Sequence, residues 1–253
     1  MSEGFTQRVK GAVARRVAMN PVRAKLDLPV ASLTFDDVPA SAARVGATIL
    51  EKNNVLGTYY MCGGHTGGRF EGLVQQTRDD IVSLRQAGHE IGCHSFTHAD
   101  VTHLSLQDRD AERLQNQAYF AALAPETDLV SFAYPYGQVS VGAKGYYAKR
   151  FFTARGVMPG INSGIVDFAE LRAISLTHKG FDLEAVRALI ARAVAHSGWL
   201  VFFTHDVDVS PTPYGCRPEE LQAVIDLLRE ARIDILPVKA AAARCMFGPG
   251  GVG

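Results

Sequence analysis

Two adjacent carboxylates, Asp36 and Asp37, follow the apolar stretch VASLTF. Neighbouring side chains on an extended chain point in different directions. One carboxylate of such a pair can bind a metal ion while the other stays free to act as a base. The alternative is a helix N-cap, because Asp37 and the nearby Pro39 would suit the start of a helix. The pair by itself leaves both interpretations open.

Two histidines four positions apart, His94 and His98, occur in HSFTH directly after HEIGC. This spacing places both imidazoles on one face of a helical turn, where they can bind one metal ion. With one carboxylate they predict an open three-ligand site that leaves room for a water. The alternative is a pair of surface histidines in a loop. His103 has a less natural spacing for a ligand, and we interpret it as structural.

His205 follows the apolar run WLVFFT. An imidazole titrates near neutral pH and suits proton donation, whereas the alternative is a structural histidine. Cys93 precedes His94 on a predicted strand and should point to the opposite face, into the core. No cysteine belongs to a CxxC pair, and we expect four free thiols. They are Cys62, Cys93, Cys216 and Cys245.

The elements that position these residues alternate between short apolar runs and segments with helical periodicity. Strands are predicted at 30–35, 55–61, 89–93, 129–134, 151–154, 199–204 and 233–238. Helices are predicted at 39–52, 69–87 and 140–148, and after Ser105, Asp182 and Arg217. This alternation indicates a mainly parallel sheet, and a (β/α) barrel of about seven strands fits it best. Reactive residues in such barrels lie at the carboxyl ends of strands, where the Asp pair and the histidines fall.

A single domain is the simplest organisation, because repeats, low-complexity linkers and abrupt changes of composition are absent. We expect a basic N-terminal extension at 1–29, the barrel at 30–240 and a frayed C-terminal tail at 241–253. Basic residues dominate the start of the extension, where Glu3 is the sole acidic residue before position 26. We favour a solvated helix docked on the barrel. Peripheral contact with an anionic membrane or a partner is the alternative.

The charge is balanced, with 26 Lys and Arg against 26 Asp and Glu, so no global field argues for a nucleic-acid partner. No segment approaches the roughly 18 apolar residues that span a bilayer, and the N-terminus does not read as a secretory signal. We therefore expect a cytoplasmic protein. Its oligomeric state, a homodimer included, stays open.

In order along the chain, TFDD, HSFTH, FAYPYG and FTH resemble the motifs of the NodB-homology polysaccharide deacetylases, carbohydrate esterase family 4. The resemblance runs from about residue 30 to 240, and GHEIGCHSFTH is its most specific part. It implies a deformed (β/α) barrel that removes N-acetyl groups from N-acetylglucosamine-type residues of a glycan. It also implies a Zn²⁺ cofactor, with Co²⁺ or Ni²⁺ as alternatives.

The resemblance implies a role for each motif residue. The first acidic residue, Asp36, is implied to be the catalytic base, and His205 the acid. The backbone N–H of Tyr136, which follows Pro135, is implied to stabilise the oxyanion. The implied metal ligands are the second acidic residue and the two histidines, which are Asp37, His94 and His98.

Two positions depart from the family's pattern. The third motif usually carries an Arg that pairs with the catalytic base, and Ala133 stands there in this chain. The fourth motif usually supplies an Asp and a Trp, and the matching stretch LRAISLTHK has neither. We expect Arg172 to replace the missing Arg beside Asp36, and His178 to take the place of the missing Asp on the substrate side. The single tryptophan, Trp199, is predicted to be a core residue.

The sequence does not name the substrate polymer. Chitooligosaccharide, peptidoglycan and bacterial exopolysaccharide are candidates, and the N-terminus favours an exopolysaccharide precursor, for example that of an adhesive holdfast. The alternatives are a deformylase or deacetylase of a lipid-linked sugar, an acetyl-xylan esterase, and an inactive metal-binding carbohydrate module.

Overall fold

The computed structural model describes residues 11–125 and 127–248. Within them the largest sheet contains eight strands, which are β2 (Val30–Asp36), β3 (Thr58–Met61), β6 (Glu90–Cys93), β7 (Ser131–Ala133), β8 (Thr153–Arg155), β10 (Ile174–Ser175), β11 (Trp199–Thr204) and β12 (Asp234–Ile235). Seven follow one another in the order β10-β11-β2-β3-β6-β7-β8, and β12 pairs with the start of β2. All of these pairings are parallel. This curled parallel sheet confirms the predicted deformed (β/α) barrel.

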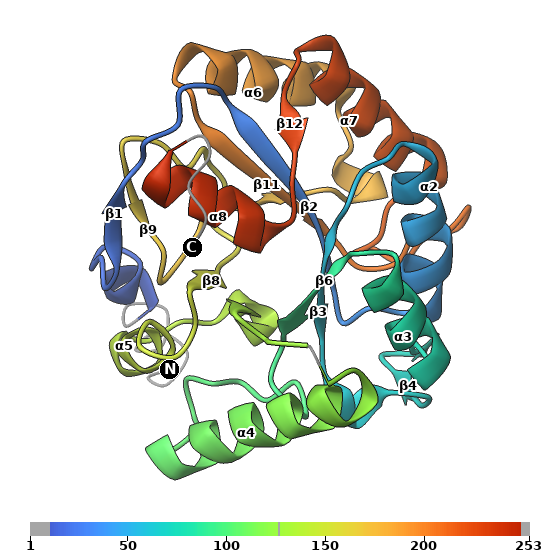
Figure 1. The fold of residues 1–253 in the computed structure, drawn as a ribbon, viewed down its shortest axis with the longest axis vertical. Helices are drawn as coiled ribbons and strands as arrows, with labels where there is room; N and C mark the ends of the chain where they lie inside the picture. Colours follow the sequence, from blue (N-terminus) through green and yellow to red (C-terminus); the bar gives the residue numbers. More distant parts are fainter. Residues whose placement is uncertain (1–10, 126, 249–253) are drawn as a thin grey trace, which may run out of the picture.

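Most of the helices surround the sheet on its outer side, whereas α8 (Val238–Phe247) lies inside their ring (Figure 1). The outer helices are α2 (Ala47–Lys52), α3 (Arg78–Gln86), α4 (Leu106–Leu123), α5 (Val141–Tyr147), α6 (Leu183–Ala195) and α7 (Pro218–Glu230). Short helical turns are η1 (Ala42–Gly46), η2 (Gly63–His65), η3 (Pro135–Gly137) and η4 (His178–Gly180). The predicted helix starts are confirmed at Ser105 and Asp182, whose side chains accept hydrogen bonds from backbone N–H groups of the first turn.

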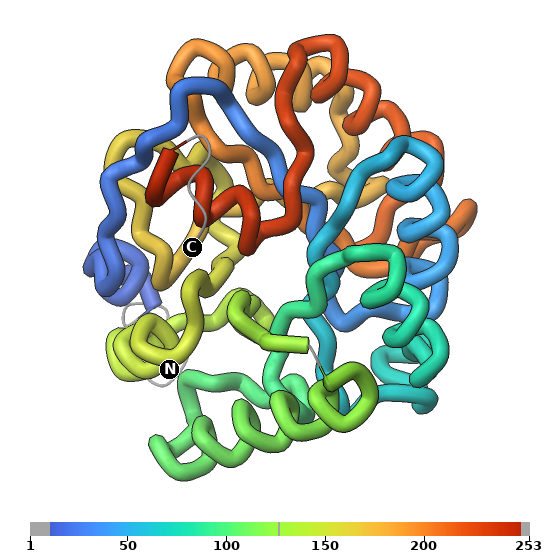
Figure 2. Tube along the Cα trace, in the orientation of Figure 1, coloured from blue at the N-terminus to red at the C-terminus, as the bar shows by residue number. Residues whose placement is uncertain are grey.

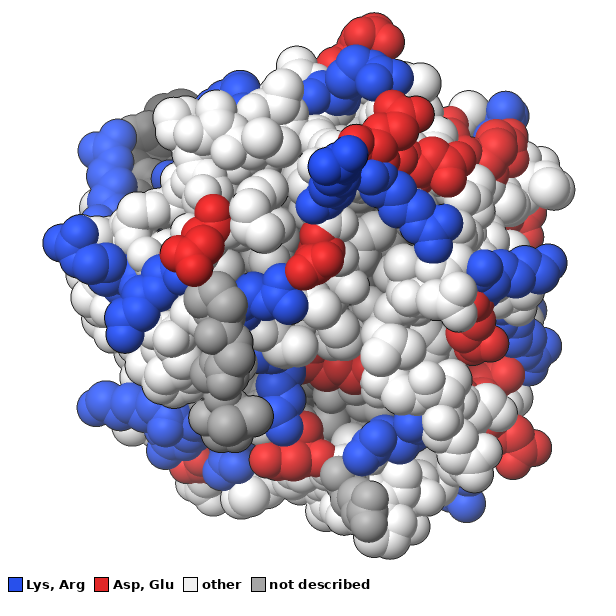
Figure 3. Space-filling model, turned by 45° about the horizontal axis from the view of Figure 1, so that its top comes forward, with Lys and Arg blue, Asp and Glu red and all other residues white. Residues whose placement is uncertain are grey.

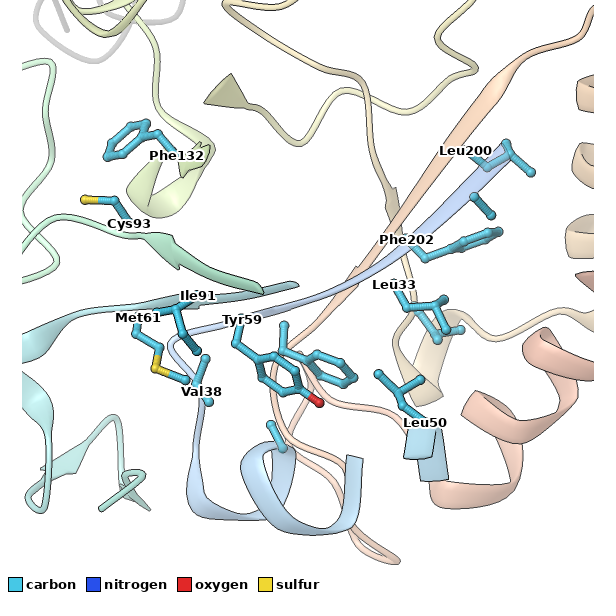
Figure 4. Packing of buried hydrophobic residues seen from close by; sticks show 14 of the residues in the cluster. Leu33, Val38, Leu50, Tyr59, Met61, Ile91, Cys93, Phe132, Leu200 and Phe202 are labelled. Atoms are coloured by element: carbon cyan, nitrogen blue, oxygen red, sulfur yellow. The ribbon is translucent and has the colours of Figure 1, made fainter. Parts of the chain in front are cut away.

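The core lies between the sheet and these helices. Every residue of β2 is buried, as expected for a central parallel strand covered on both faces. Leu33 of β2 lies beside Phe202 of β11, and Tyr59 of β3 lies further along the same layer (Figure 4). Trp199 is fully buried in a second cluster and donates its indole N–H to Ser32 Oγ at 3.0 Å. The prediction that Trp199 is a core residue is confirmed.

The predicted helix at 69–87 is wrong in its first half. The structure has an antiparallel hairpin there, β4 (Arg69–Phe70) and β5 (Leu73–Val74). Glu71 and Gly72 form its turn with positive φ angles of 47° and 83°. The helix begins only after Thr77, which forms a capping box with Asp80. Two-residue strands are too short to show a periodicity, so the capping box is the better guide to where this helix starts.

The two ends of the described chain pack on the barrel. The frayed tail expected from residue 241 is wrong up to Phe247, because α8 continues through it and buries Ala241, Ala242 and Cys245. At the other end, β1 (Pro21–Arg23) pairs with β9 (Ile165–Asp167), and the blue start of the trace lies beside the yellow β9 segment (Figure 2). Residues 11–23 are thus docked on the barrel, but only 11–14 are helical and the segment ends in β1, so it is not the helix that we favoured; residues 1–10 of the extension lie outside the described residues.

Basic and acidic side chains are interspersed over the face seen in Figure 3, with basic ones more frequent along its left side. Among the described residues no helix is both long enough and apolar enough to cross a membrane.

Candidate active site

The predicted reactive residues meet at one edge of the sheet. Asp36 ends β2, His94 follows the last residue of β6, and His205 follows the last residue of β11. The parallel pairing of β11 with β2 and of β3 with both β2 and β6 brings these ends together. They line a cleft of about 380 Å³ with Tyr136 and His98. The structure thus brings the predicted reactive residues together at the carboxyl ends of the strands.

Asp37, His94 and His98 form a compact buried group. Asp37 Oδ1 lies 3.2 Å from His98 Nε2 and 3.6 Å from His94 Nε2. One ligand atom from each residue lies within 4.8 Å of the other two. Asp37 and His98 adopt left-handed backbone conformations with φ of 57° and 59°. Such a conformation costs roughly 1–2 kcal/mol per residue, so the surrounding structure must hold these side chains in place.

A backbone carbonyl fixes the orientation of one imidazole. His94 Nδ1 lies 2.8 Å from the carbonyl oxygen of Ala133. An N–H donated to that oxygen leaves the Nε2 lone pair turned towards Asp37, which is the tautomer a metal ligand needs. Ala133, which stands where the resemblance predicts an arginine, therefore orients His94 through its backbone carbonyl. His98 is held by rings instead, with Tyr136 and Phe70 centroids 4.3 and 5.0 Å from its own.

Burial controls the charge of this group. It raises the pKa of Asp37 to about 8, assisted by the negative charges of Asp36 and Glu71. It lowers the pKa of His94 to about 3, with Arg155 contributing, and that of His98 to about 2, with His94 contributing. Both imidazoles are therefore neutral, the form that binds metals. Asp37 Oδ1 is buried and accepts no hydrogen bond within the described residues. The group lacks a positive charge, and its donor set fits a divalent transition-metal ion.

The neighbouring Asp36 carboxylate has a cation of its own. Arg155 Nη2 contacts both Asp36 oxygens at 2.5 Å, and the arginine side chain is fully buried. The Arg155 guanidinium carbon also lies 4.9 Å from the ring centroid of Phe203 and 5.3 Å from that of Tyr60. These aromatic faces favour a buried cation. Arg155 is thus the arginine that pairs with Asp36.

The prediction that Arg172 pairs with Asp36 is wrong. Its side chain is exposed and donates from Nη1 to the carbonyl oxygen of Pro159 at 3.1 Å. Leu171 and Ala173 on either side are fully buried, so the alternation of this extended segment turns residue 172 outward. Sequence analysis overlooked Arg155, although its position could have indicated it. Arg155 is the last residue of β8, as Asp36 is the last residue of β2.

The structure also does not bring His178 to the substrate side. Its Nδ1 lies 2.6 Å from Glu220 Oε1 near the start of α7, and the ring is not among the residues that line the cleft. Leu176 and Thr177 separate it from the end of β10 at Ser175, which does line the cleft. The chain has already turned into η4 at that point, so the residue at the motif position faces a helix instead of the active site.

His205 lies at the edge of the metal group. Its Nε2 is 3.7 Å from Asp37 Oδ2, and its ring centroid is 5.5 Å from that of Tyr214. Its Nδ1 is buried and has no hydrogen-bond partner among the described residues. The adjacent Asp206 carboxylate accepts hydrogen bonds from the backbone N–H and the hydroxyl of Thr212 instead. His205 is therefore placed for proton transfer but lacks an orienting carboxylate.

Tyr136 projects from a strained turn beside the cleft. Its φ of 57° and the φ of 61° at Gly137 place two successive residues in the left-handed region. A Cβ at position 137 would meet Val157 at 2.3 Å, so this position requires glycine. Tyr136 is 56% exposed and lines the cleft, while Pro135 is buried at the start of the turn.

Sequence analysis missed several residues that line the cleft or its smaller side lobe. Among them, Phe70 and Glu71 come from the β4–β5 hairpin, and Tyr214 comes from the loop after β11. With Asp37 and His205 they border a smaller lobe of about 140 Å³. Glycine at position 72 is consistent with a turn, but nothing in the local sequence indicates that this turn folds over the metal group.

The cysteines behave as predicted. All four are buried and free. Cys93 lies in the hydrophobic core beside the Asn116 amide, 3.2 Å away. Cys62 donates its S–H to the carbonyl oxygen of His94 at 2.9 Å, so it supports a metal-group residue without joining the group. His103 lies outside the group as well, with Nε2 3.7 Å from Asp100.

Comparison with known proteins places these residues in context. The sequence model of a family described as polysaccharide deacetylase matches residues 23–151, just over half of the chain. A bifunctional xylanase/deacetylase of Pseudobutyrivibrio xylanivorans is 32% identical over 113 residues, which cover 43% of this chain and 17% of that protein. A chitin deacetylase of Colletotrichum lindemuthianum is 32% identical over 78 residues, 31% of this chain and 30% of that protein. The chain thus spans less than a third of the length of these curated relatives.

Solved structures extend the likeness to nearly the whole chain. The chitin deacetylase structure from the fungal pathogen Colletotrichum lindemuthianum matches with a TM-score of 0.61 at 19% identity. The match covers 90% of this chain and 92% of that one. At this level of identity the likeness shows a shared fold, and a coverage of 90% extends it well beyond residue 151.

Proposed function

The chain belongs to the polysaccharide deacetylase family, and on that premise we propose that it is a metal-dependent N-deacetylase of a glycan containing N-acetylglucosamine. One observation carries the proposal, which is that two half-sites of different charge share one cleft. Asp36 is paired with the buried Arg155, whereas Asp37, His94 and His98 form a group that lacks a cation. Hydrolysis of an amide needs a base for water and a positive charge near the carbonyl, and the two half-sites match these needs.

The metal would be held by Asp37, His94 and His98. A divalent ion in that place makes a nearby water more acidic and polarises an acyl carbonyl. Imidazole and carboxylate ligands in an open three-ligand set suit Zn²⁺, and Co²⁺ or Ni²⁺ can use the same ligands.

Residues of the chain itself carry out the proton transfers. Asp36, oriented by Arg155, takes a proton from the attacking water as the new C–O bond forms. The backbone N–H of Tyr136 donates a hydrogen bond to the developing oxyanion, a contribution of about 3 kcal/mol for one such donor. His205 then gives a proton to the departing nitrogen as the C–N bond breaks. The products are acetate and a free amine on the sugar.

The shape of the cleft supports a carbohydrate substrate. Tyr136 and Tyr214, which are 56% and 58% exposed, line it, and their rings offer apolar surface to a sugar face. Within this class we propose a bacterial exopolysaccharide or its precursor, modified in the cytoplasm. The similarity to a xylanase/deacetylase favours one second candidate, an esterase acting on acetylated xylan.

A panel of substrates tests the proposal. The purified protein is incubated with N-acetylglucosamine oligomers, peptidoglycan fragments and acetylated xylo-oligosaccharides, and loss of acetyl groups is followed by mass spectrometry. We expect free amines on the amino-sugar oligomers, loss of the reaction after chelation and its return with Zn²⁺. The His94→Ala variant serves as the matched negative control. Cleavage of the ester substrate alone would favour the esterase, and turnover that survives both chelation and His94→Ala would contradict the metal-dependent mechanism.

A further inference from the structure

A short segment before the family match reaches the active-site turn. Residues 11–22 precede residue 23, where the match to the family begins. Arg15 in this segment donates from Nη2 to the carbonyl oxygen of Gly137 at 3.0 Å. Gly137 directly follows Tyr136, and both residues line the cleft. The N-terminal segment therefore contacts the back of the turn whose front faces the substrate.

We propose that Arg15 is a positioning residue for deacetylation, which holds the Tyr136–Gly137 turn in its active conformation from outside the cleft. The proposal rests on the proposed function, in which the Tyr136 N–H stabilises the oxyanion. The left-handed conformation of Tyr136 is unfavourable for a residue with a Cβ, whereas Gly137 adopts it freely, and such a conformation persists only where neighbouring groups restrain it. Within the turn, the Gly137 N–H bonds to the Tyr134 carbonyl at 2.9 Å. Arg15 adds the restraint on the Gly137 carbonyl from a distant part of the chain.

The Arg15 guanidinium also faces a buried carboxylate on its other side. Its Nε lies 3.6 Å from Glu170 Oε1, and the Glu170 side chain is only 6% exposed. Glu170 in turn accepts from Lys144 Nζ at 2.8 Å. Glu170 also packs next to Gly156, the residue after Arg155, where an added Cβ would meet its side chain at 2.9 Å. Arg15 therefore links the Tyr136–Gly137 turn to the end of the strand that supplies the partner of Asp36.

The backbone around Arg15 is anchored firmly enough for this role. Lys144 is 1% exposed, and its Nζ contacts the carbonyl oxygen of Ala14 at 3.2 Å and Asp167 Oδ2 at 2.8 Å. The backbone N–H groups of Met19 and Asn20 also bond to the Asp167 carboxylate. These contacts hold the segment on both sides of Arg15, and the blue start of the trace lies against this region in Figure 2.

Arg15→Ala and Arg15→Lys test the proposal in the full-length, metal-loaded protein, with Arg16→Ala as the matched control. Arg16 is the adjacent residue, and its side chain is exposed. For Arg15→Ala we expect kcat to fall about tenfold, the equivalent of one hydrogen bond from a charged donor, with KM and metal content close to wild type. Arg15→Lys should fall less, because an ammonium still reaches one of the two acceptors. Guanidinium ion at millimolar concentration should restore part of the kcat of Arg15→Ala and leave Arg16→Ala unchanged.

Hydrogen–deuterium exchange gives a readout that does not depend on turnover. In Arg15→Ala the amides of residues 134–140 should exchange faster, while those of β11 exchange as in wild type. A kcat within twofold of wild type together with unchanged exchange at 134–140 would overturn the proposal. So would a loss of activity that guanidinium does not restore and that follows the loss of folded protein. If the wild type deacetylates nothing, the proposed function fails, and the exchange measurement still decides whether Arg15 restrains the turn.

Discussion

Asp36 and Asp37 are neighbours in the chain, yet the two halves of the cleft around them differ in charge. Asp36 meets the guanidinium of Arg155, a cation that the protein itself has buried. Asp37 meets two neutral imidazoles, and its pKa is raised to about 8, chiefly because burial disfavours its charge. In the first half the polypeptide supplies both the negative and the positive charge. In the second half the Asp37 carboxylate has no cationic partner of its own, and either a proton or a bound metal ion would neutralise it.

This difference in charge separates the residues that stabilise the fold from the residues that would bind the metal ion. Removing a partner from the Asp36 half leaves an uncompensated charge in the interior, which damages the fold as well as the reaction. Removing a ligand from the Asp37 half relieves an unfavourable cluster of buried groups in the metal-free protein. The two halves should therefore respond differently to substitution, in stability and in metal binding.

The largest effect on activity is expected for His94→Ala and His98→Ala. Each variant loses one of three ligands, so stoichiometric metal and measurable deacetylation should both disappear, while the metal-free protein stays folded. Metal content is measured by elemental analysis after dialysis. His103→Ala is the matched control, because its imidazole lies outside the group and should be dispensable for metal. Full metal content in both single variants would refute the ligand assignment.

Asp36→Asn should come next. The amide keeps the shape of the side chain and removes its basicity, so turnover should drop at least ~10²-fold, the low end for general-base catalysis. Metal content should stay at the wild-type level, which distinguishes this variant from the histidine variants. Turnover near wild type would assign the base to another residue.

Arg155→Met should have the largest effect on stability. It leaves the Asp36 carboxylate buried without its partner, which we expect to lower the free energy of unfolding by about 3–5 kcal/mol. Urea denaturation of the metal-free protein measures this change. The double variant Asp36→Asn/Arg155→Met should recover much of the loss, because the isolated charge is gone. Strict additivity of the two substitutions would show that the pair does not interact as the geometry indicates.

The smallest effect is expected for Arg172→Ala. Its guanidinium is exposed and bonds to the Pro159 carbonyl, away from Asp36. The free energy of unfolding should change by about 0.5 kcal/mol or less, and kcat/KM should stay near wild type. A loss approaching that of Asp36→Asn would restore Arg172 as a functional partner of the base.

The sequence predicted those site residues that directly follow or end a recognisable strand. Asp36, Asp37, His94 and His205 lie at the ends of apolar strands, and the parallel arrangement of those strands brings them together. Arg155 was missed because its partner lies 119 positions away and no short motif joins the two. Arg172 and His178 were placed by their distance along a motif, but the chain turns outward at the first and into η4 at the second. The hairpin that brings Phe70 and Glu71 to the cleft consists of two-residue strands, which leave no readable pattern.

Asp36 and Arg155 are far apart along the chain, so the parts of the site are synthesised at different times. Asp37, His94 and His98 have all left the ribosome once residue 98 has emerged, well before β8 is made. Contacts between distant residues form late in folding, because a long loop must close first. The Asp36 carboxylate can be neutralised only when β8 has joined the curled sheet, and His205 arrives later still. A nascent chain that ends at residue 151 therefore already carries all three proposed ligands for the ion, while the partner of the proposed base and the proposed acid are still to be translated.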